Sequence, residues 1–205
     1  MDWSSLGLAA AASSTSGLSL YATMLTLGLL QRFHWLDLPA EWRLLGSTWM
    51  IGLAAALFAI EFVADKIPYI DSIWDSVHTF IRVPAGAVLM ASAFAEVSPA
   101  AKLIAGLLGG SLALTTHSAK ASARLAANAS PEPISNTLLS LGEDFVTVFL
   151  LGMAASHPVL AMVALAIVLV ICLIVLYVCV KFVRVFFGKL KTWFGGEAVE
   201  STPIT

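Results

Sequence analysis

The stretch from Pro158 to Val180 reads PVLAMVALAIVLVICLIVLYVCV and contains no charged residue, and Lys181 and Arg184 follow it. A helix needs roughly 20 mostly apolar residues to cross the hydrocarbon core of a bilayer, so this stretch predicts a membrane-spanning helix. The whole composition agrees, because 59% of the side chains are hydrophobic, only 12% are charged and the mean hydropathy is +0.91. A soluble domain carries about 25% charged residues. The sequence therefore predicts an all-α membrane protein without a large extramembrane catalytic domain.

The apolar segments on the N-terminal side of this stretch predict five more spans. Only residues 44–60 form a second long, uninterrupted run; the other segments reach spanning length when they are extended through polar neighbours. Those polar groups must face protein or water, because lipid offers them no hydrogen-bond partner. The six predicted spans are residues 4–31, 44–60, 78–97, 101–127, 135–156 and 158–180.

The distribution of Lys and Arg predicts how these spans are oriented. Six spans place both termini on one side of the membrane, and short cytoplasmic loops hold an excess of basic residues. With both termini inside, eight of the eleven basic residues are cytoplasmic and three, Arg32, Arg43 and Lys102, are external. We therefore expect a multi-pass protein with both termini in the cytoplasm. Residues 186–205 then form a cytoplasmic tail, first amphipathic and then disordered.

Two hydroxyl-rich clusters suggest an internal repeat. Residues 13–17 (SSTSG) and residues 115–119 (TTHSA) are 102 positions apart, and each interrupts an apolar helix. Three spans per half is an odd number, so the halves would insert with inverted topology. The sequence thus predicts two inverted three-helix repeats, residues 1–97 and 98–185, with broken first and fourth helices. Such helices hold the substrate or ion in secondary transporters, although hydroxyl clusters can also bond to their own helix or allow close packing.

The densest polar segment predicts an amphipathic helix near residues 69–82 at the cytoplasmic interface. Glu61 and Asp65 are four residues apart, and the next charged residues recur at steps of four, three and four, which places them on one helix face. The predicted cytoplasmic polar stripe comprises Asp65, Asp71, Asp75, His78 and Arg82. The spacing allows three roles: binding a divalent cation, relaying protons, or a chain of ion pairs. Whether a metal binds stays open at this point.

Ionisable residues also occur at the fourth and fifth predicted spans. Glu143 and Asp144 precede an apolar run, and Lys120 and Arg124 are four residues apart in the fourth span. Because charges at membrane depth are costly, we expect Glu143 to pair with Lys120 or Arg124. The predicted substrate or ion pathway comprises Ser14, Thr15, Ser16, Glu61, Thr116, His117, Ser118, Lys120, Arg124, Glu143 and Asp144.

These features favour a secondary transporter or channel for a small solute, ion or lipid headgroup, which could be proton-coupled. Nucleic acid is excluded as a partner, because the net charge of −2 gives no basic surplus. No zinc, phosphate-loop or dinucleotide motif occurs, so we expect no cofactor and no enzymatic activity. The alternatives are a non-catalytic membrane subunit, which could be a homo-oligomer, and an intramembrane hydrolase in which Ser16 meets His117.

Several motifs resemble an uncharacterised family of small bacterial integral-membrane proteins, domain of unknown function 4126. The resemblance is carried by Thr15-Ser16-Gly17-Leu18, the acidic run from Glu61 to Arg82, Pro84-Ala85-Gly86-Ala87, and Asn136 through Glu143-Asp144. It covers nearly the whole chain up to about Phe187, and Val83 departs from the family pattern. The resemblance implies a bacterial inner-membrane location and assigns no activity and no functional residue.

Overall fold

The computed structural model describes residues 3–67, 69–94, 97–128 and 133–194, and all regular structure within them is helical. The predicted disordered end, residues 195–205, lies outside the described residues. The helices are α1 (Trp3–Leu18), α2 (Leu20–Arg32), the 3₁₀ helix η1 (Ala40–Gly46), α3 (Thr48–Ala64), α4 (Ile70–Ser92), α5 (Pro99–Asn128), α6 (Pro133–Ser156) and α7 (Pro158–Phe194).

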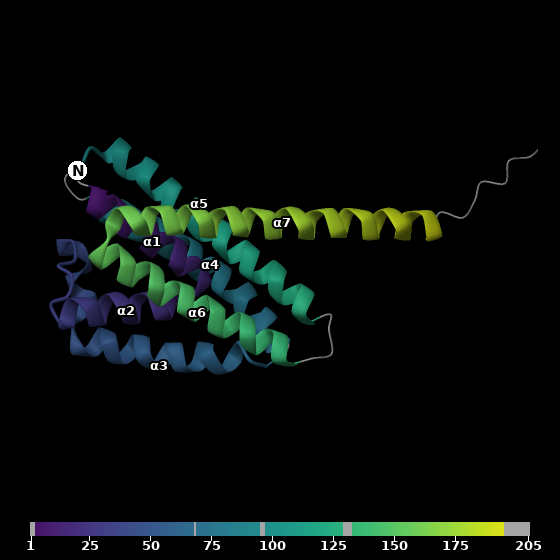
Figure 1. Cartoon of the computed structure of the whole chain (residues 1–205), viewed down its shortest axis with the longest axis horizontal. Coiled ribbons are helices and arrows are strands. Elements are labelled where there is room, and N and C mark those ends of the chain that lie inside the picture. The colour runs from purple at the N-terminus through teal and green to yellow at the C-terminus, as the bar shows by residue number, and fades with distance from the viewer. Residues whose placement is uncertain (1–2, 68, 95–96, 129–132, 195–205) are drawn as a thin grey trace, which may run out of the picture.

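The first two helices form a hairpin that enters the bundle and returns to the end where it began (Figure 1). The turn is a single residue, Ser19, whose extended backbone (φ −146°, ψ 100°) separates α1 from α2. The start of α1 and the loop after α2 line one cavity, to which Ser4 and Leu36 both contribute. We call this end of the bundle the N-terminal end. The hairpin tip at Ser19 lies inside the bundle, where it contacts Glu61 of α3.

The other helices run between the N-terminal end and the opposite end. The end of α4 and the junction of α6 with α7 line the same cavity as Ser4, through Phe94 and Ala155. At the opposite end, Asn128 of α5 bonds to Asp71 at the start of α4 and to Asn136 at the start of α6. The 37-residue helix α7 starts at the N-terminal end and extends past the opposite end (Figure 1).

This course corrects the predicted arrangement of six inverted spans. Residues 4–31 do not run from one end to the other, because the chain turns back at Ser19. Consequently α1 and α5 both start at the N-terminal end, whereas inverted repeats require them to run in opposite directions. The first helix is broken as expected, a few residues after the hydroxyl cluster, but α5 continues unbroken through residues 115–119. Trp3 and Phe194 lie at opposite ends of the bundle, and the placement of both termini on one side of the membrane stays a prediction.

Three described helices, α5, α6 and α7, are long and apolar enough to cross a membrane, and the bent pair of η1 and α3 would make a fourth. α4 falls outside this group because its first half carries several charges. Its faces are nevertheless arranged for apolar surroundings: Phe80 is 83% exposed and Ile73 67% exposed, whereas Arg82 is fully buried. Exposed apolar groups around a buried polar face are expected when lipid, not water, surrounds a helix.

The predicted interfacial helix of residues 69–82 is therefore the first half of α4, which continues through Pro84 to Ser92. Its polar stripe does not face solvent, because Asp71, Asp75 and His78 are at most 5% exposed. These side chains bond to partners inside the bundle instead: Asp71 to α5 and α6, Asp75 to Arg82 of α4 and Lys120 of α5, and His78 to α2. The first part of the predicted tail, residues 186–194, is likewise a continuation of a longer helix, α7.

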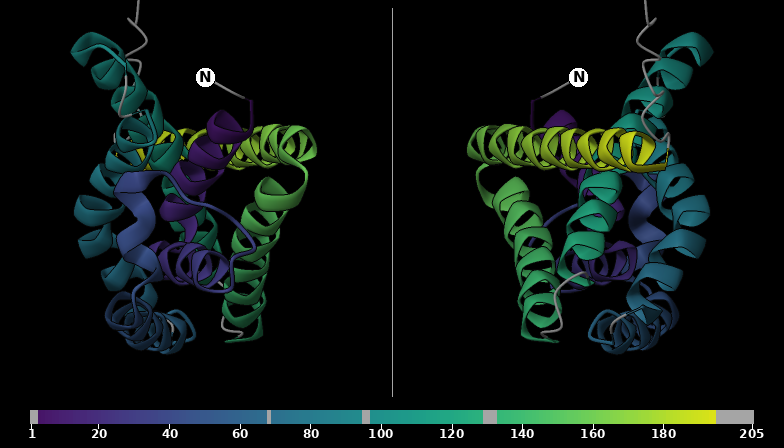
Figure 2. Two further views of the ribbon diagram at one scale, coloured as in Figure 1. Left: turned by 90° about the vertical axis from the view of Figure 1, so that its left-hand side faces the viewer. Right: turned by 90° about the vertical axis from the view of Figure 1, so that its right-hand side faces the viewer.

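Small residues hold α1, α4 and α5 close together in the centre of the bundle. In the two end-on views of Figure 2, α1 lies inside the bundle, where it contacts α4, α5, α6 and α7. Gly17 faces α5 so closely that a Cβ atom would overlap the Ala113 carbonyl oxygen and the Thr116 hydroxyl. At the same residue of α5, a Cβ on Gly86 of α4 would lie 2.5 Å from the Ala113 Cβ. This close packing also brings the charged residues of α4, which precede Gly86, near those of α5, which follow Ala113.

Candidate functional site: a buried ionic network

Ionisable side chains from α3, α4, α5 and α6 meet around the tip of the α1–α2 hairpin. The broken helix offers both of its ends to this cluster. The Leu18 carbonyl at the end of α1 accepts a hydrogen bond from Lys120 Nζ at 2.9 Å, and Ser19, at the start of α2, donates its hydroxyl to Glu61 at 2.8 Å. A cation at a helix C-terminus and an anion at a helix N-terminus are both favourable to the helix dipole.

Arg82 links the carboxylates of α3 and α4. Its guanidinium donates to Glu61 and, at 2.8 Å, to Asp75. All three side chains are at most 3% exposed. Because an unpaired charge at such depth is costly, the Arg82–Glu61 pair fixes the relative positions of α3 and α4, whereas the Arg82–Asp75 pair lies within α4.

Lys120 and Arg124, one turn apart on α5, join three helices. Lys120 Nζ lies 3.0 Å from Asp65, 3.2 Å from Glu143 and 3.6 Å from Asp75. Arg124 donates to Asp65 and to Glu143, each at 2.8 Å. The pairing of Glu143 with these bases, expected from the sequence, is therefore present with both of them. Asp65, at the end of α3, is part of the same cluster rather than of a solvated loop.

Asp71 is bonded differently from the other carboxylates, because neutral groups supply most of its hydrogen bonds. It accepts from the Ser72 backbone at 2.6 Å, from Asn128 at 3.0 Å and from Asn136 at 3.2 Å, while the nearest Arg124 nitrogen is 3.7 Å away. Asn128 was not predicted as a site residue, and Asn136 was predicted only as part of a family pattern. Two amides near the ends of neighbouring spans are the signal that could have identified them.

The network contains more acids than bases. It comprises five carboxylates (Glu61, Asp65, Asp71, Asp75 and Glu143) and three basic side chains (Arg82, Lys120 and Arg124). With neutral imidazoles this leaves a formal charge of −2 inside the bundle. One oxygen of Asp65 and one of Asp75 are buried without a hydrogen-bond partner. A buried surplus of this kind favours the uptake of positive charge, such as protons.

His117 borders the network, and its hydrogen bonds indicate a neutral ring. Nδ1 lies 3.3 Å from an Arg82 nitrogen, which can only donate, so Nδ1 accepts. Nε2 lies 2.6 Å from the Thr79 hydroxyl, whose own proton is donated to the Asp75 carbonyl at 3.0 Å. A neutral ring with its proton on Nε2 satisfies both contacts, since Nδ1 then accepts from Arg82 and Nε2 donates to Thr79. Thr79 is a site residue that the sequence analysis did not single out.

His78 lies on the same face of α4 and contacts the hairpin. Its Nδ1 is 2.8 Å from the Trp74 carbonyl, which can only accept, and its Nε2 is 3.1 Å from the Tyr21 hydroxyl of α2. Because Tyr21 can either donate or accept, both the neutral and the protonated ring are satisfied at this position. Tyr21, which carries one of the hydroxyl groups of α2, is a further site residue that was not predicted.

The two hydroxyl clusters meet, but they are closely packed. Thr116 Oγ1 donates to the Ser14 carbonyl at 2.7 Å, while Thr15 and Ser16 donate to carbonyls of their own helix. Ser14, Thr15 and Ser16 are at most 1% exposed. Ser118 is half-buried and joins none of these contacts. The clusters therefore form a packed layer above the network and not the polar cavity that the pathway prediction implied.

The structure also shows the surroundings of three other predicted residues, Ser16, His117 and Asp144. Ser16 bonds to Ser13 of its own helix and His117 bonds to Thr79 and Arg82, so the structure does not pair Ser16 with His117 as a hydrolase would require. Asp144 is half-buried beside the network. Among the described residues, no three His, Cys, Asp or Glu side chains are grouped so that they could hold a metal ion.

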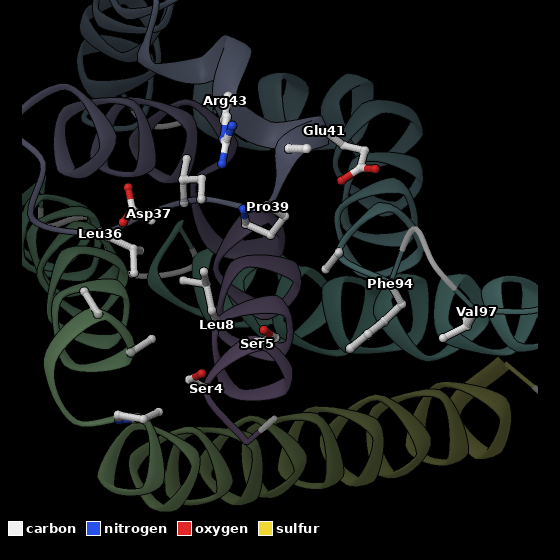
Figure 3. A pocket seen from close by; sticks show the side chains of 16 residues that line it. Ser4, Ser5, Leu8, Leu36, Asp37, Pro39, Glu41, Arg43, Phe94 and Val97 are labelled. Atoms are coloured by element: carbon white, nitrogen blue, oxygen red, sulfur yellow. The ribbon is translucent and has the colours of Figure 1, made fainter. Parts of the chain in front are cut away.

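A cavity of about 770 Å³ opens at the N-terminal end (Figure 3). We call it the vestibule. Asp37, Glu41 and Arg43 line its mouth, and Leu8 and Phe94 lie at its apolar side. Leu8 and Phe94 also belong to the buried apolar core that includes Ala12. Along α1 the order is thus vestibule, apolar core, hydroxyl layer and ionic network.

Lys66 marks the rim of the network at the opposite end, in the turn after α3. Its ammonium group lies 2.9 Å from the centre of the Phe62 ring and 3.4 Å from the Ser140 hydroxyl. Partial burial lowers the pKa of Lys66, whereas the nearby carboxylates of Asp144 and Asp65 act in the opposite direction.

The fold and the site define a class: a helical protein with spans apolar enough for a membrane, built around a buried ionic network at the tip of a helical hairpin. The chain belongs to the family described as domain of unknown function (DUF4126), whose sequence profile matches residues 6–178. No curated protein and no solved structure shows a significant match to the chain.

Proposed function

We propose that this protein translocates protons across the bacterial inner membrane, as a transporter or channel that can couple proton movement to a small solute. The observation that carries the proposal is the buried network with five carboxylates, three basic side chains and two adjoining histidines. Ionisable groups at membrane depth are expensive, and they commonly form ion or proton pathways. A surplus of buried acids is suited to a group of residues that binds and releases protons during its cycle.

The hairpin adds independent support. Half-helix ends that meet buried charges near the middle of a bundle are characteristic of secondary transporters. Here the Leu18 carbonyl contacts Lys120 and Ser19 contacts Glu61, so both half-helix ends are connected to the network. A change in the charge of the network would alter the stability of the turn.

We infer five crossings, α3 to α7, together with the re-entrant hairpin of α1 and α2. The basic residues then predict the orientation. Arg32, Arg43 and Lys102 belong to the N-terminal end, whereas Lys66, Lys181 and the rest of the basic residues belong to the network or the opposite end. Under the positive-inside rule the opposite end faces the cytoplasm, so the C-terminus is cytoplasmic and the N-terminus is external. In the described conformation the apolar core separates the external vestibule from the network.

The close packing of α1, α4 and α5 favours a second candidate, a non-catalytic membrane subunit whose ion pairs only fix the helix arrangement. The two functions differ in a measurable way. We expect liposomes that contain the purified protein and a pH-sensitive dye to acidify faster than protein-free liposomes when a potassium diffusion potential is imposed. A subunit with a purely structural network would leave the rate at the protein-free level.

Variants of Glu143 make this test specific. Glu143→Gln should abolish the flux and leave the protein folded, because an amide cannot exchange the proton but can still accept from Lys120 and Arg124. Glu143→Asp, which keeps a carboxylate, should retain part of the flux. Lys102→Met, which changes a charge on the same α5 helix far from the network, serves as the control and should behave as wild type.

A further inference from the structure

A small cavity lies between α4 and α5, on the side of the network that faces the opposite end. It has a volume of about 100 Å³ and is lined by Asp75, Thr79, His117 and Arg124, together with Ser72, Ser76, Ala121 and Leu125. A single water molecule needs only about 10–15 Å³ of such space and two to four polar partners. The cavity is therefore large enough and polar enough to hold several water molecules.

Two buried atoms point to water in this cavity. Oδ2 of Asp75 and Nε of Arg124 both lack a hydrogen-bond partner, although both residues line the cavity and are at most 2% exposed. The two atoms lie 4.0 Å apart, which is too far for a direct hydrogen bond. One is an acceptor and the other a donor. A water molecule between them could accept from Arg124 and donate to Asp75, and so satisfy both.

The charges around the cavity exclude other small ligands. Arg82 from α4 and Lys120 and Arg124 from α5 surround Asp75, so a metal cation would be repelled. Asp75 itself would repel an anion, and its partners bring Glu61 from α3 and Glu143 from α6 close by. His117 faces the same space as a neutral ring. Water is the ligand that suits a donor and an acceptor at this spacing.

The cavity also lies where water can reach it. Ser72 is in the first turn of α4, and Leu125 is in the last turn of α5. Ser76 and Leu125 are exposed, and Leu125 is 65% exposed. The ring of residues thus opens within about one to two helical turns of the opposite end, whereas the N-terminal end is separated from the network by the apolar core.

We propose that this cavity is a water-filled port that connects the buried network to the aqueous phase at the opposite end of the bundle. One water molecule bridges Asp75 and Arg124, and its neighbours extend to the mouth at Ser76. The port supplies the network with protons on that side, and this role rests on the proton translocation proposed above. A proton taken up at the mouth can be relayed along these waters, because each water accepts one proton and passes another on; the bridging water donates to Asp75, and every water in the chain is left neutral.

The reactivity of an introduced cysteine tests whether the cavity contains water, and this test needs no assumption about transport. In a variant that lacks the two native cysteines, Ala121→Cys should react with a small water-soluble methanethiosulfonate within seconds to minutes, since only a hydrated thiol ionises. Leu108→Cys, at an exposed position in the apolar first half of α5, is the control for a thiol outside the cavity, and we expect it to react far more slowly in a lipid bilayer. If Ala121→Cys reacts no faster than Leu108→Cys, the cavity is dry and the port does not exist.

A plug variant tests the role of the port. Ala121→Phe places a ring in the cavity without removing a charge, and it should reduce proton flux at least tenfold, whereas Leu108→Phe, at an exposed position of α5 away from the cavity, should leave flux unchanged. Unfolding temperatures of both variants show whether they remain folded. If Ala121→Phe does not fold, the smaller substitution Ala121→Leu is tested in its place. If wild type conducts and the folded plug conducts equally, the port does not supply the protons. If wild type does not conduct, the translocation proposal fails, while the labelling result alone decides whether the water is there.

Discussion

The acid surplus of the network leads to an asymmetric response to charge removal. Removal of a cation should be costly, whereas removal of a carboxylate should be nearly neutral. Lys120→Met keeps the length of the side chain but leaves Asp65, Glu143 and the Leu18 carbonyl without their ammonium partner. It also changes the formal charge of the network from −2 to −3. Breaking a buried pair from one side costs about 3–5 kcal/mol.

Asp65→Asn is the matched change of opposite sign. The amide oxygen can still accept from Lys120 and Arg124, and the amide nitrogen replaces Oδ1, which has no hydrogen-bond partner in the wild type. The formal charge of the network changes from −2 to −1. No group that has a hydrogen-bond partner in the wild type loses it in this variant. We therefore expect the free energy of unfolding to fall by less than about 1 kcal/mol, at the small end of the cost for single hydrogen-bond changes.

Thermal unfolding of the detergent-solubilised protein, followed by tryptophan fluorescence, measures both changes. For a chain of this size 1 kcal/mol corresponds to roughly 2–4 °C, so Lys120→Met should lower Tm by roughly 6–20 °C and Asp65→Asn by less than about 4 °C. Lys102→Met, on the same helix outside the network, controls for the loss of a lysine. Equal losses for Lys120→Met and Asp65→Asn would show that the network holds no acid surplus, and would refute the reasoning.

Three further predictions address the packing, the topology and the protonation state. Gly17→Ala should lower Tm by several degrees because its methyl group overlaps α5, whereas Gly52→Ala, which meets nothing within 4 Å, should not; equal effects would contradict the close crossing of α1 and α5. With the native cysteines removed, Ser4→Cys and Lys181→Cys should react with a membrane-impermeant maleimide from opposite sides of the membrane; reaction from one side would restore the six-span topology. Nitrogen-15 NMR of labelled histidine should show His117 neutral at pH 7 with its proton on Nε2, and a doubly protonated ring would disprove the hydrogen-bond assignment.

The sequence predicted those contacts that follow from spacing and charge. The steps between Asp71, Asp75 and Arg82 place them on one helix face whatever that face contacts. Likewise, Glu143 had to find Lys120 or Arg124 because no other strong base lies at a comparable depth in the neighbouring spans. Both inferences need only helix periodicity and the cost of an isolated charge in an apolar environment.

The sequence did not reveal which way the polar face of α4 points. An amphipathic helix with one charged and one apolar stripe can lie on a membrane surface or turn its charges inward, and the pattern is the same in both cases. The choice is made by partners that are distant in sequence. Arg82 pairs with Glu61, and Asp75 lies 3.6 Å from Lys120, so burial of the stripe depends on contacts that periodicity cannot report.

The turn at Ser19 could not be predicted for a related reason. Serine is a good N-cap residue but a weak helix breaker, and neither proline nor a glycine with positive φ marks the position. Tertiary contacts compensate for the interruption: Lys120 binds the carbonyl that α1 leaves free, and Glu61 takes the serine hydroxyl that would otherwise cap α2. The same charges that form the candidate proton site therefore also hold the hairpin in place. Protonation of Glu61, or withdrawal of Lys120 from Leu18, would weaken the turn itself, so a change of charge in the network and a movement of the hairpin are coupled by their shared hydrogen bonds.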